Sequence, residues 1–540
     1  MIPVVVGSSP IGHPTVQTPV ERELKFRLDA KSAARAARLI PFAARPQCTR
    51  LYSVYYDTPD LRLYRAGVSL RLRRAGRRWL QTLKAPQGAQ SALAARSEWE
   101  MAAPRGVLDC KLFQREAVRA ATGLDLLRLA RRLRPVFATR FERRSGPLAL
   151  GHGLRALACI DRGAIEAGRA REPLLELELE LIEGELGPLI GLAETLVEPL
   201  NLRIEHASKA ERGYRLCLGA APPAPAKWLR PAIAENAAAS DAFATLCVTA
   251  LAQIGANADG LARGRDIEYL HQLRVGVRRL RSALRAFRWL LRRRRARAVE
   301  APLKRMMVTF GAARDWDVFC ETLADAALAP GLLARARPKR WAARRAAQRA
   351  VTSAAFQQAQ LRALRWLHGD PWKSDTARAA PLARFAREAL ARLHFALMKR
   401  SRGIDWRNAR RRHAVRIGVK RLRYACDFFA GCFPRQAVQP FLTRLASLQD
   451  TLGELNDVTV ARALIAELAP RGAAQTLRAE AVRLRHWLAS RERELMALLE
   501  PAWQAFEAKR PFWLAMRDPQ VAASARSEIR RRPDRRLRAR

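Results

Sequence analysis

Seven residues of strictly alternating character, Leu175-Glu-Leu-Glu-Leu-Glu-Leu181, constrain this chain more than any other feature. A period of two is typical of a β-strand, so the three glutamates share one face and the four leucines the other. Carboxylates at every second position repel one another, and folding alone does not require them. They become acceptable where that face meets bound cations or a wall of Lys and Arg.

Other segments carry charged residues at the same spacing. These residues are Glu21, Glu23, Lys25, Arg71, Arg73, Lys84, Glu98 and Glu100. Acidic alternation in some segments and basic alternation in others predicts a closed sheet whose interior is charged rather than apolar. The alternative is an ordinary sheet with an exposed charged face, and the number of such segments favours the tunnel. Carboxylates in it can hold Mg²⁺ or Mn²⁺, while Arg and Lys can clamp phosphate oxygens.

Length and charge limit the remaining possibilities. A chain of 540 residues is too long for one core, so we expect two or three domains. The net charge of +49 suits a polyanionic partner, although the Ala/Arg-rich composition explains a single exposed arginine equally well. The eight cysteines are scattered without metal-ligand spacing, which suits a reducing compartment. With no signal-peptide pattern and no apolar run of roughly 20 residues, we expect a cytoplasmic protein without a membrane partner.

The periodicity of the chain changes at a proline-rich stretch. Residues 19–218 alternate short strand patterns with turns, and residues 235–512 are almost entirely helix-periodic. Residues 219–234 between them are expected to form a stiff proline-rich linker. We expect a disordered start over residues 1–18 and a basic tail over residues 513–540.

The helical half contains an internal duplication. The segment that begins at His271 matches the segment that begins at His413, and the same offset relates Asp315 to Asp457. Matches at one constant offset indicate two copies of one supersecondary unit. We expect each aspartate to return on a later helix, where it would orient the histidine or pair with an arginine.

Each copy predicts a helix with one aliphatic face and one basic stripe. The stripes consist of His271, Arg274, Arg278 and Arg281 in the first copy and of His413, Arg416, Lys420 and Arg423 in the second. An isolated histidine among arginines is a poor metal ligand. Contact with phosphate is therefore the favoured interpretation, and structural burial of the histidine is the next alternative.

The motifs of residues 19–218, taken in order, resemble a CYTH domain of the triphosphate tunnel metalloenzyme superfamily. The motifs are Glu21-Arg-Glu-Leu-Lys25, Tyr55-to-Pro59, Leu70-to-Arg73, Thr82-to-Lys84, Glu98-Trp-Glu100, Asp161-Arg-Gly163, the Leu175-to-Leu181 strand and Ser208-to-Tyr214. The resemblance implies an eight-stranded antiparallel β tunnel that binds triphosphate and a divalent metal, Mg²⁺ or Mn²⁺.

The same resemblance implies a role for individual residues. It implies catalytic roles for Glu21, Glu23 and Lys25. It implies contacts to metal or water for Glu21, Glu23, Glu98, Glu100, Glu176, Glu178 and Glu180. It implies contacts to substrate phosphates for Lys25, Arg71, Arg73, Lys84, Arg140, Lys209 and Arg212.

Residues 235–512 resemble a CHAD domain, with His271, His413 and their basic stripes as the motif residues. This resemblance implies an all-α, pseudo-symmetric double helical bundle that binds inorganic polyphosphate through the eight stripe residues. The whole chain is thus expected to be an α+β protein of two domains, a β tunnel followed by the helical bundle.

The favoured function is that of a metal-dependent inorganic triphosphatase that cuts tripolyphosphate, with inorganic triphosphate and polyphosphate as its partners. Two alternatives stay open. One is a non-catalytic polyphosphate-binding protein, and the other is a CYTH enzyme acting on thiamine triphosphate or a nucleotide. No specific nucleic-acid partner is expected, because no aromatic residues interleave with the basic ones. Within the cytoplasm, polyphosphate granules would be one place to find such a protein.

Overall fold

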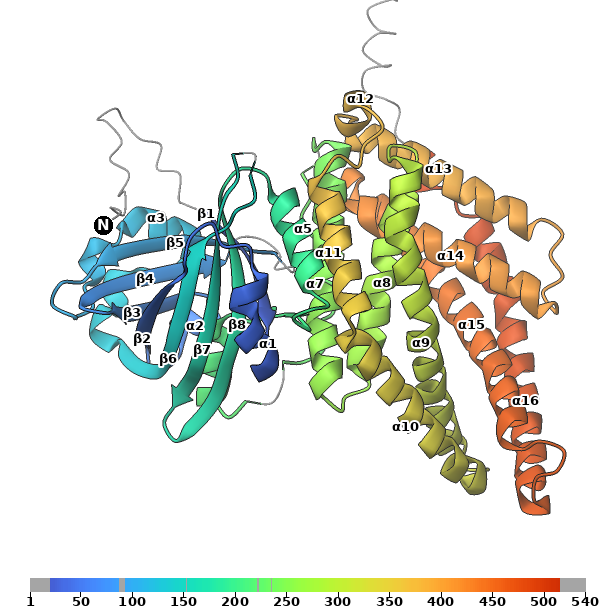
Figure 1. Cartoon of the computed structure of the whole chain (residues 1–540). Helices are drawn as coiled ribbons and strands as arrows, with labels where there is room; N and C mark the ends of the chain where they lie inside the picture. Colours follow the sequence, from blue (N-terminus) through green and yellow to red (C-terminus); the bar gives the residue numbers. More distant parts are fainter. Residues whose placement is uncertain (1–19, 87–92, 152, 221–222, 235, 515–540) are drawn as a thin grey trace, which may run out of the picture. The chain divides into compact units, whose positions relative to one another are not determined.

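The computed structural model describes residues 20–86, 93–151, 153–220, 223–234 and 236–514. The chain forms two compact units (Figure 1). The first contains the residues up to 223 together with 360–368, and the second contains the remaining residues from 224 onward. The expected disordered start and all but the first two residues of the expected basic tail lie outside the described residues.

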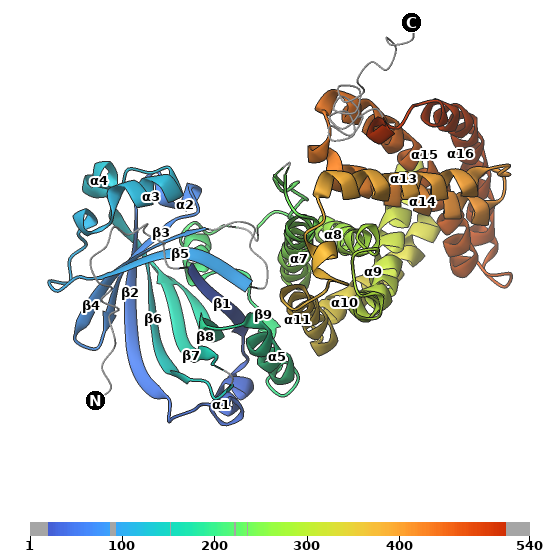
Figure 2. The same ribbon diagram turned by 90° about the horizontal axis from the view of Figure 1, so that it is seen from above.

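The strands of the first unit form one antiparallel sheet that closes on itself (Figure 2). The strands are β1 Val20–Arg27, β2 Gln47–Asp57, β3 Ser69–Ala75, β4 Arg78–Pro86, β5 Leu93–Ala102, β6 Arg134–Pro147, β7 Arg155–Ala167, β8 Ala170–Glu183 and β9 Arg203–Ile204. The order is β5-β4-β3-β2-β6-β7-β8-β1, and β1 pairs back onto β5. The predicted eight-stranded tunnel is this closed ring. The sheet has nine strands because the two-residue β9 also pairs with the end of β1.

Strand β8 contains the alternating leucine and glutamate segment. Its register with β1 places Lys25 opposite Glu178 and Glu23 opposite Glu180, so the charged residues of both strands lie side by side on one face. Leu177 and Leu179 are fully buried on the other face, which is the side where helices α1 Ala30–Leu39 and α5 Leu186–Leu196 pack against the strand. The predicted division of this strand into an apolar and a charged face is confirmed.

One apolar cluster of the first unit lies outside the barrel. On the outer side of β3, β4 and β5, Leu70, Leu83 and Trp99 form a buried cluster with residues of the short helices α2 Arg62–Arg65, α3 Arg115–Thr122 and α4 Leu126–Leu129. Figure 2 shows these helices on one flank of the barrel and α1 and α5 on another. The inward faces carry the charged residues together with a smaller apolar cluster of Leu51, Phe141 and Leu174.

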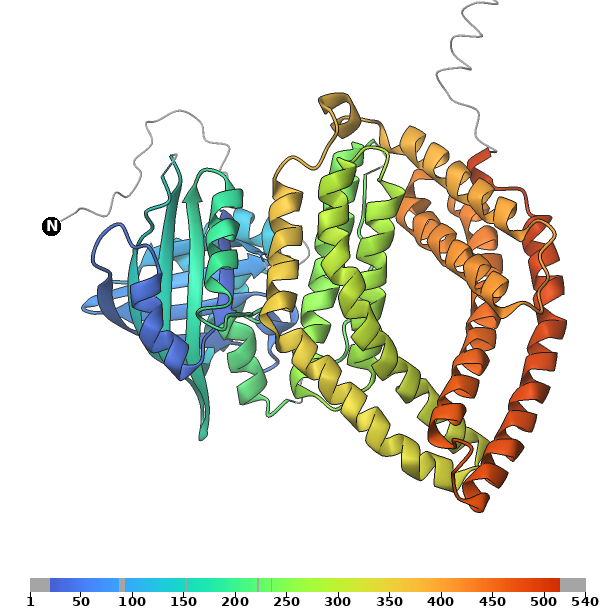
Figure 3. The same cartoon turned by 45° about the vertical axis from the view of Figure 1, so that its right-hand side comes forward.

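The second unit consists of two similar sets of helices (Figure 3). The first set is α7 Ala239–Arg263, α8 Glu268–Ala286, α9 Arg293–Ala326 and α10 Pro330–Thr352, and the second, after the short α12 Asp375–Arg378, is α13 Leu382–Ser401, α14 Ala409–Phe429, α15 Arg435–Leu468 and α16 Gln475–Glu507. Between the two sets lies α11 Ala354–His368, whose residues from 360 onward belong to the first unit. Helix α7 packs on α8 as α13 packs on α14, and α9 and α10 pair as α15 and α16 do. The predicted antiparallel sheet followed by a pseudo-symmetric helical bundle is confirmed.

A glycine in each half allows the first two helices to approach closely. A Cβ at Gly276 would lie 2.9 Å from the Ile254 side chain of α7, and a Cβ at Gly418 would lie 2.9 Å from the Leu397 side chain of α13. Gly276 and Gly418 thus occupy equivalent positions in equivalent helix contacts, which supports the relation between the two halves. The aliphatic faces predicted for α8 and α14 are buried, with Leu273 and Val419 both fully inaccessible.

Two further features concern the start of the helical unit. Helix α7 is the one described helix long and apolar enough to cross a membrane by length and composition alone, and 56% of its most apolar window is buried within the protein. The later residues of the predicted proline-rich linker contact the helices: the backbone of Ala226 hydrogen-bonds Asn257, and Arg230 pairs with Asp427.

Candidate functional site

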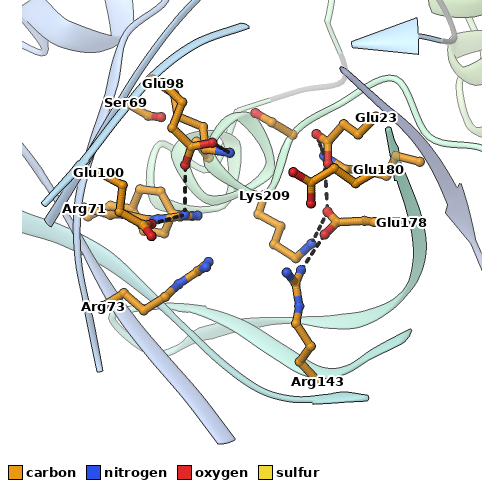
Figure 4. A pocket seen from close by; sticks show the side chains of 15 residues that line it. Glu23, Ser69, Arg71, Arg73, Glu98, Glu100, Arg143, Glu178, Glu180 and Lys209 are labelled. Atoms are coloured by element: carbon orange, nitrogen blue, oxygen red, sulfur yellow. Dashed lines mark hydrogen bonds and ion pairs between the residues drawn. The ribbon is translucent and has the colours of Figure 1, made fainter. Parts of the chain in front are cut away.

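Charged side chains from two sides of the barrel line a cavity of about 230 Å³ (Figure 4). Strands β3, β4 and β5 contribute Arg71, Arg73, Lys84, Glu98 and Glu100. The opposite side, formed by β1, β6, β8 and the first turn of helix α6 Lys209–Cys217, contributes Glu23, Lys25, Arg143, Glu178, Glu180 and Lys209. Six cations and five carboxylates thus share one interior.

The cations of the first side are held by the two glutamates of β5. Arg71 lies 3.7 Å from Glu98 and 3.8 Å from Glu100, and the Lys84 ammonium lies 3.1 Å from Glu98. Pairing between neighbouring strands causes this arrangement, because β4 and β5 place Lys84 directly opposite Glu98. These contacts position the cations with their charged ends in the cavity.

Arg73 differs from its neighbours because no carboxylate pairs with it among the described residues. It is 9% exposed, and its Nε donates to the Ser53 hydroxyl at 3.1 Å. Burial, together with the positive charges of Arg71 and Arg143, lowers the pKa of Arg73 to about 10. A buried guanidinium without a counter-ion is costly, so an anion in the cavity would be bound favourably here.

Lys209 provides the centre of the opposite side. It is the first residue of α6, which begins with a capping box between Ser208 and Glu211 that fixes the direction of the first turn. Its ammonium lies 2.9 Å from Asp161, 2.6 Å from Glu176 and 2.7 Å from Glu178. Burial alone would lower the pKa of Lys209, but the three carboxylates outweigh it and hold this pKa well above its ordinary value. Lys209 therefore stays protonated.

Asp161, Glu176 and Glu178 have the spacing of a metal site, with ligand oxygens within 4.8 Å of one another and all three residues buried. The Lys209 ammonium already lies among them, and Arg143 pairs with both Asp161 and Glu178. These cations neutralise the cluster in the way that a metal would. The carboxylates that line the cavity are the better candidate metal ligands. Outside that cluster they are Glu23, Glu98, Glu100 and Glu180.

Among the described side chains that the sequence assigned to this site, three do not reach the cavity and the others do. Glu176 is fully buried behind it, where it pairs with Arg212, which is 3% exposed and also contacts Glu172 at 2.7 Å. The backbone of Glu21 lies in β1, and its side chain is outside the described part of the structure. The remaining prediction, Arg140, needs a correction.

Arg140 points out of the barrel. Its side chain is 67% exposed and stacks on Tyr52, with 4.8 Å between the guanidinium carbon and the ring centroid. Arg143, three residues later, lies on the face that β6 turns inward, together with the buried Phe141. Since side chains alternate along a strand, residues three apart are on opposite faces. We therefore replace Arg140 by Arg143 in the proposed phosphate-binding set.

Sequence reasoning also missed three smaller polar residues of the lining, Tyr55, Ser69 and Ser208. Burial would raise the pKa of Tyr55, but the charges of Arg71 and Arg73 outweigh it and lower this pKa. Tyr55 and Ser208 belong to motifs that were recognised, and the alternation of β2 places Tyr55 on the same face as Ser53. Ser69 could have been found as the residue two before Arg71.

In the helical unit, the two basic stripes face each other. Arg274 of α8 is electrostatically coupled to Arg416 of α14, and Lys420 of α14 is coupled to Arg278 of α8. Burial, followed by the charges of Arg416 and Arg278, lowers the pKa of Lys420 to about 7. Stripe residues thus crowd into one half-buried cluster, whose charges repel in the absence of an anion.

The ends of the stripes have different surroundings. Arg281 pairs with Glu300 at 3.1 Å, while Arg423 is half-buried on α14. The His413 Nδ1 lies 2.9 Å from the Asn456 side-chain oxygen, at the edge of a cavity of about 280 Å³. The histidine is thus oriented by Asn456, while the neighbouring Asp457 interacts with Arg416, which is the second of the two roles expected for the aspartate.

The two aspartates lie within the stripe cluster. Asp315 and Asp457 interact electrostatically with each other and with Arg416, and burial raises the pKa of both above the ordinary value for aspartate. Burial lowers the pKa of His271, and the negative charge of Glu268 opposes this shift. Two acids are too few to neutralise this cluster.

Comparison with known proteins places each unit in a family. Residues 20–214 match the CYTH domain model, and residues 247–466 match the CHAD domain model. A curated protein of Haemophilus influenzae named "Inorganic triphosphatase" is 30% identical over 171 residues, which are 31% of this chain and 46% of that protein. The chain thus spans less than half of the length of this relative.

Two solved structures resemble single parts of the chain. The CHAD domain from the plant Ricinus communis is 33% identical and covers 53% of this chain and 98% of its own, with a TM-score of 0.46. A Hippeastrum protein described as having a dominant triphosphatase activity is 16% identical over 36% of this chain and 95% of its own, with a TM-score of 0.29. On the two family models, which together match most of its length, this chain belongs to the proteins that join a CYTH domain to a CHAD domain.

Proposed function

We propose that the CYTH domain is a metal-dependent inorganic triphosphatase that cuts tripolyphosphate to pyrophosphate and phosphate. The observation that carries the proposal is the buried guanidinium of Arg73, which has no carboxylate partner among the described residues in a cavity that five further cations line. A linear triphosphate supplies the missing negative charge along its whole length. The name of the Haemophilus relative supports the same reaction.

The residues of the cavity can perform the binding and orientation that phosphoryl transfer requires. Arg71, Arg73 and Lys84 on one side and Arg143 and Lys209 on the other would hold the phosphate oxygens from both directions. Mg²⁺ or Mn²⁺, held by the lining carboxylates, would supply charge neutralisation and an activated water. The ion pairs already fix the cation positions, so little reorganisation accompanies the build-up of charge in the transition state.

We further propose that the CHAD domain binds inorganic polyphosphate through the two facing stripes, as a protein of the cytoplasm. The support is the crowding of Arg274, Arg278, Arg416 and Lys420, whose mutual repulsion a polyanion would relieve. A chain that reaches both stripes binds more tightly than one that reaches a single stripe, because the second contact is intramolecular.

Phosphate release from tripolyphosphate, ATP and thiamine triphosphate, measured with Mg²⁺ and with Mn²⁺, tests the triphosphatase. We expect tripolyphosphate to have the highest kcat/KM. Arg73→Gln should lower this value by roughly 100-fold, because it removes a charge-assisted contact to phosphate. Arg140→Gln is the matched control: it removes the same charge from the same barrel but outside the cavity, and it should leave kcat/KM within about twofold of wild type. Equal effects of the two variants would contradict the proposed site, and a preference for ATP would contradict the substrate.

A further inference from the structure

Helices α8, α13 and α14 enclose a second basic pocket, with a cavity of about 140 Å³. Its charged lining consists of Arg285, Arg288, Arg392, Arg400 and Arg421, and none of these residues belongs to the stripes defined above. Alanine and leucine side chains and the ring of Trp289 form the rest of the wall. Five guanidinium groups around so small a space need negative charge from some source.

The protein itself supplies only part of that charge. Arg285 pairs with Glu300 at 3.1 Å, and Arg392 pairs with Glu388 at 3.0 Å. Among the described residues, Arg288, Arg400 and Arg421 have no acidic partner, and the buried Nε of Arg421 has no hydrogen-bond acceptor. The pKa of Arg421 falls to about 10, chiefly because the group is buried and also because the positive charges of Arg285 and Arg400 lie close to it.

The Trp289 ring stacks on two of the arginines, Arg288, which has no acidic partner among the described residues, and Arg392, which also pairs with Glu388. The guanidinium carbons of Arg288 and Arg392 lie 4.3 Å and 5.0 Å from its ring centroid. A cation–π contact of this kind holds a guanidinium in position without neutralising its charge. The two groups are therefore oriented and still able to bind an anion, and the indole ring is in direct contact with them.

The equivalent place in the first half of the domain is neutralised, which shows that the fold does not require the charge. Three residues after Gly276, the counterpart of Gly418, comes Arg279, the counterpart of Arg421. Arg279 donates to Asp427 at 2.6 Å and stacks on Trp228 at 4.4 Å. Asp427 lies in the second half, and its counterpart in the first half is Arg285, so the position beside Arg421 holds an arginine where Arg279 has an acid.

A second difference between the two halves also places an arginine in the pocket. Ile254 and Leu397 occupy equivalent positions, and three residues after them come Asn257 and Arg400. Asn257 accepts from the backbone N–H of Ala226 and donates to its carbonyl, so that the segment before α7 is held against this surface. In the second half, Arg400 replaces that amide. The acid and the amide at one of the two equivalent places, Asp427 and Asn257, thus both have an arginine as their counterpart at the other place, Arg285 and Arg400.

We propose that this pocket is a binding site for short inorganic phosphates, that is, orthophosphate or pyrophosphate. Guanidinium groups bind phosphate oxygens in pairs through parallel hydrogen bonds, and the volume suits one or two phosphate groups rather than a folded chain. The inference does not depend on the triphosphatase reaction, although both anions would be products of that reaction.

The Trp289 ring provides a local reporter of binding in the full chain. The protein is labelled with 5-fluorotryptophan, and the fluorine resonance of Trp289 is identified by its loss in Trp289→Phe. The labelled protein is then titrated with orthophosphate and with pyrophosphate at constant ionic strength. We expect a saturable shift with at least one of them. Arg421→Gln and the more exposed Arg400→Asn should each weaken binding by roughly tenfold, as expected for the loss of one charge-assisted contact.

Lys399→Gln is the matched control, because Lys399 is the exposed neighbour of Arg400 on α13 and does not line the pocket. It should bind like wild type. The proposal is overturned if the Trp289 resonance does not respond, if chloride at the same ionic strength produces the same shift, or if Lys399→Gln weakens binding as much as Arg400→Asn. A response to long polyphosphate alone would also overturn it and would assign the pocket to the long-chain site.

Discussion

Lys420 illustrates how far the surroundings of a single residue change its chemistry. It is half-buried beside Arg416 on its own helix, faces Arg278 and Arg274 of α8, and has Asp457 of α15 as its acidic neighbour. Burial is the largest influence and the arginines are the next, so its pKa falls to about 7. A lysine with this pKa is only partly protonated near neutral pH, and an approaching anion raises the pKa, so that anion binding takes up a proton.

The first prediction concerns this proton. At about pH 8, binding of long polyphosphate to the full chain should take up close to one proton, because the bound anion raises the pKa of Lys420. Affinity should fall by up to about tenfold per pH unit above 7 as protonation becomes costlier. Calorimetric titration in two buffers of different ionisation enthalpy measures the uptake. Lys420→Met serves as the control and should show no such uptake. Equal uptake in both proteins, or none in wild type, would rule out Lys420 as the titrating group.

At the scale of elements, the barrel depends on the close approach of β6 and β7. Gly163 of β7 lies opposite Phe141 of β6, and a Cβ at Gly163 would lie 2.1 Å from the Arg140 carbonyl oxygen and 2.5 Å from the Phe141 Cα. Both neighbours are largely backbone, so neither can rotate away. The ladder that carries Arg143 into the cavity therefore tolerates only glycine at this position.

The second prediction tests this approach. Gly163→Ala should lower the free energy of unfolding of the CYTH domain by roughly 2–4 kcal/mol, because the two strands must separate to admit a methyl group. Gly187→Ala is the control, since Gly187 lies in α5, where an added Cβ would meet no other atom within 4 Å. It should be neutral or slightly stabilising. Urea unfolding monitored by circular dichroism compares the two variants with wild type. Similar stabilities of Gly163→Ala and Gly187→Ala would contradict the close packing of β6 and β7.

The sequence was sufficient for some elements and insufficient for others. Alternation within β8 predicted both of its faces, because a buried strand offers only two. The position of Arg140 was carried over from a family resemblance, and only the direction of β6 shows that Arg143 is the residue inside. The second pocket of the helical domain could not be predicted, because it depends on how α8, α13 and α14 bring five arginines together. Contacts between distant segments of this kind leave no period in the sequence.

At the scale of the whole molecule, every strand of the closed ring lies before residue 184, and every side chain described in the cavity lies before residue 211. The helical unit has a separate core, with Phe243 and Phe441 fully buried in it. Each part therefore has the interior that independent folding requires.

The third prediction follows for the isolated parts. Residues 1–220 should hydrolyse tripolyphosphate in the presence of Mg²⁺ or Mn²⁺ with a kcat/KM within roughly threefold of the full chain, since a domain with its own core retains its site. Phosphate release measures activity, and circular dichroism shows whether the fragment is folded. A fragment that is folded but inactive would mean that the helical half contributes to catalysis.

Closure of the ring also affects how this domain behaves in a crowded solution. The edge of an open sheet presents unpaired N–H and C=O groups on which another chain can add a strand. Here each of the eight ring strands has a partner on both sides, and the edge that remains among the described strands is β9, which is two residues long. The domain can therefore be concentrated around a polyanion by its large positive charge without offering a template for β-aggregation.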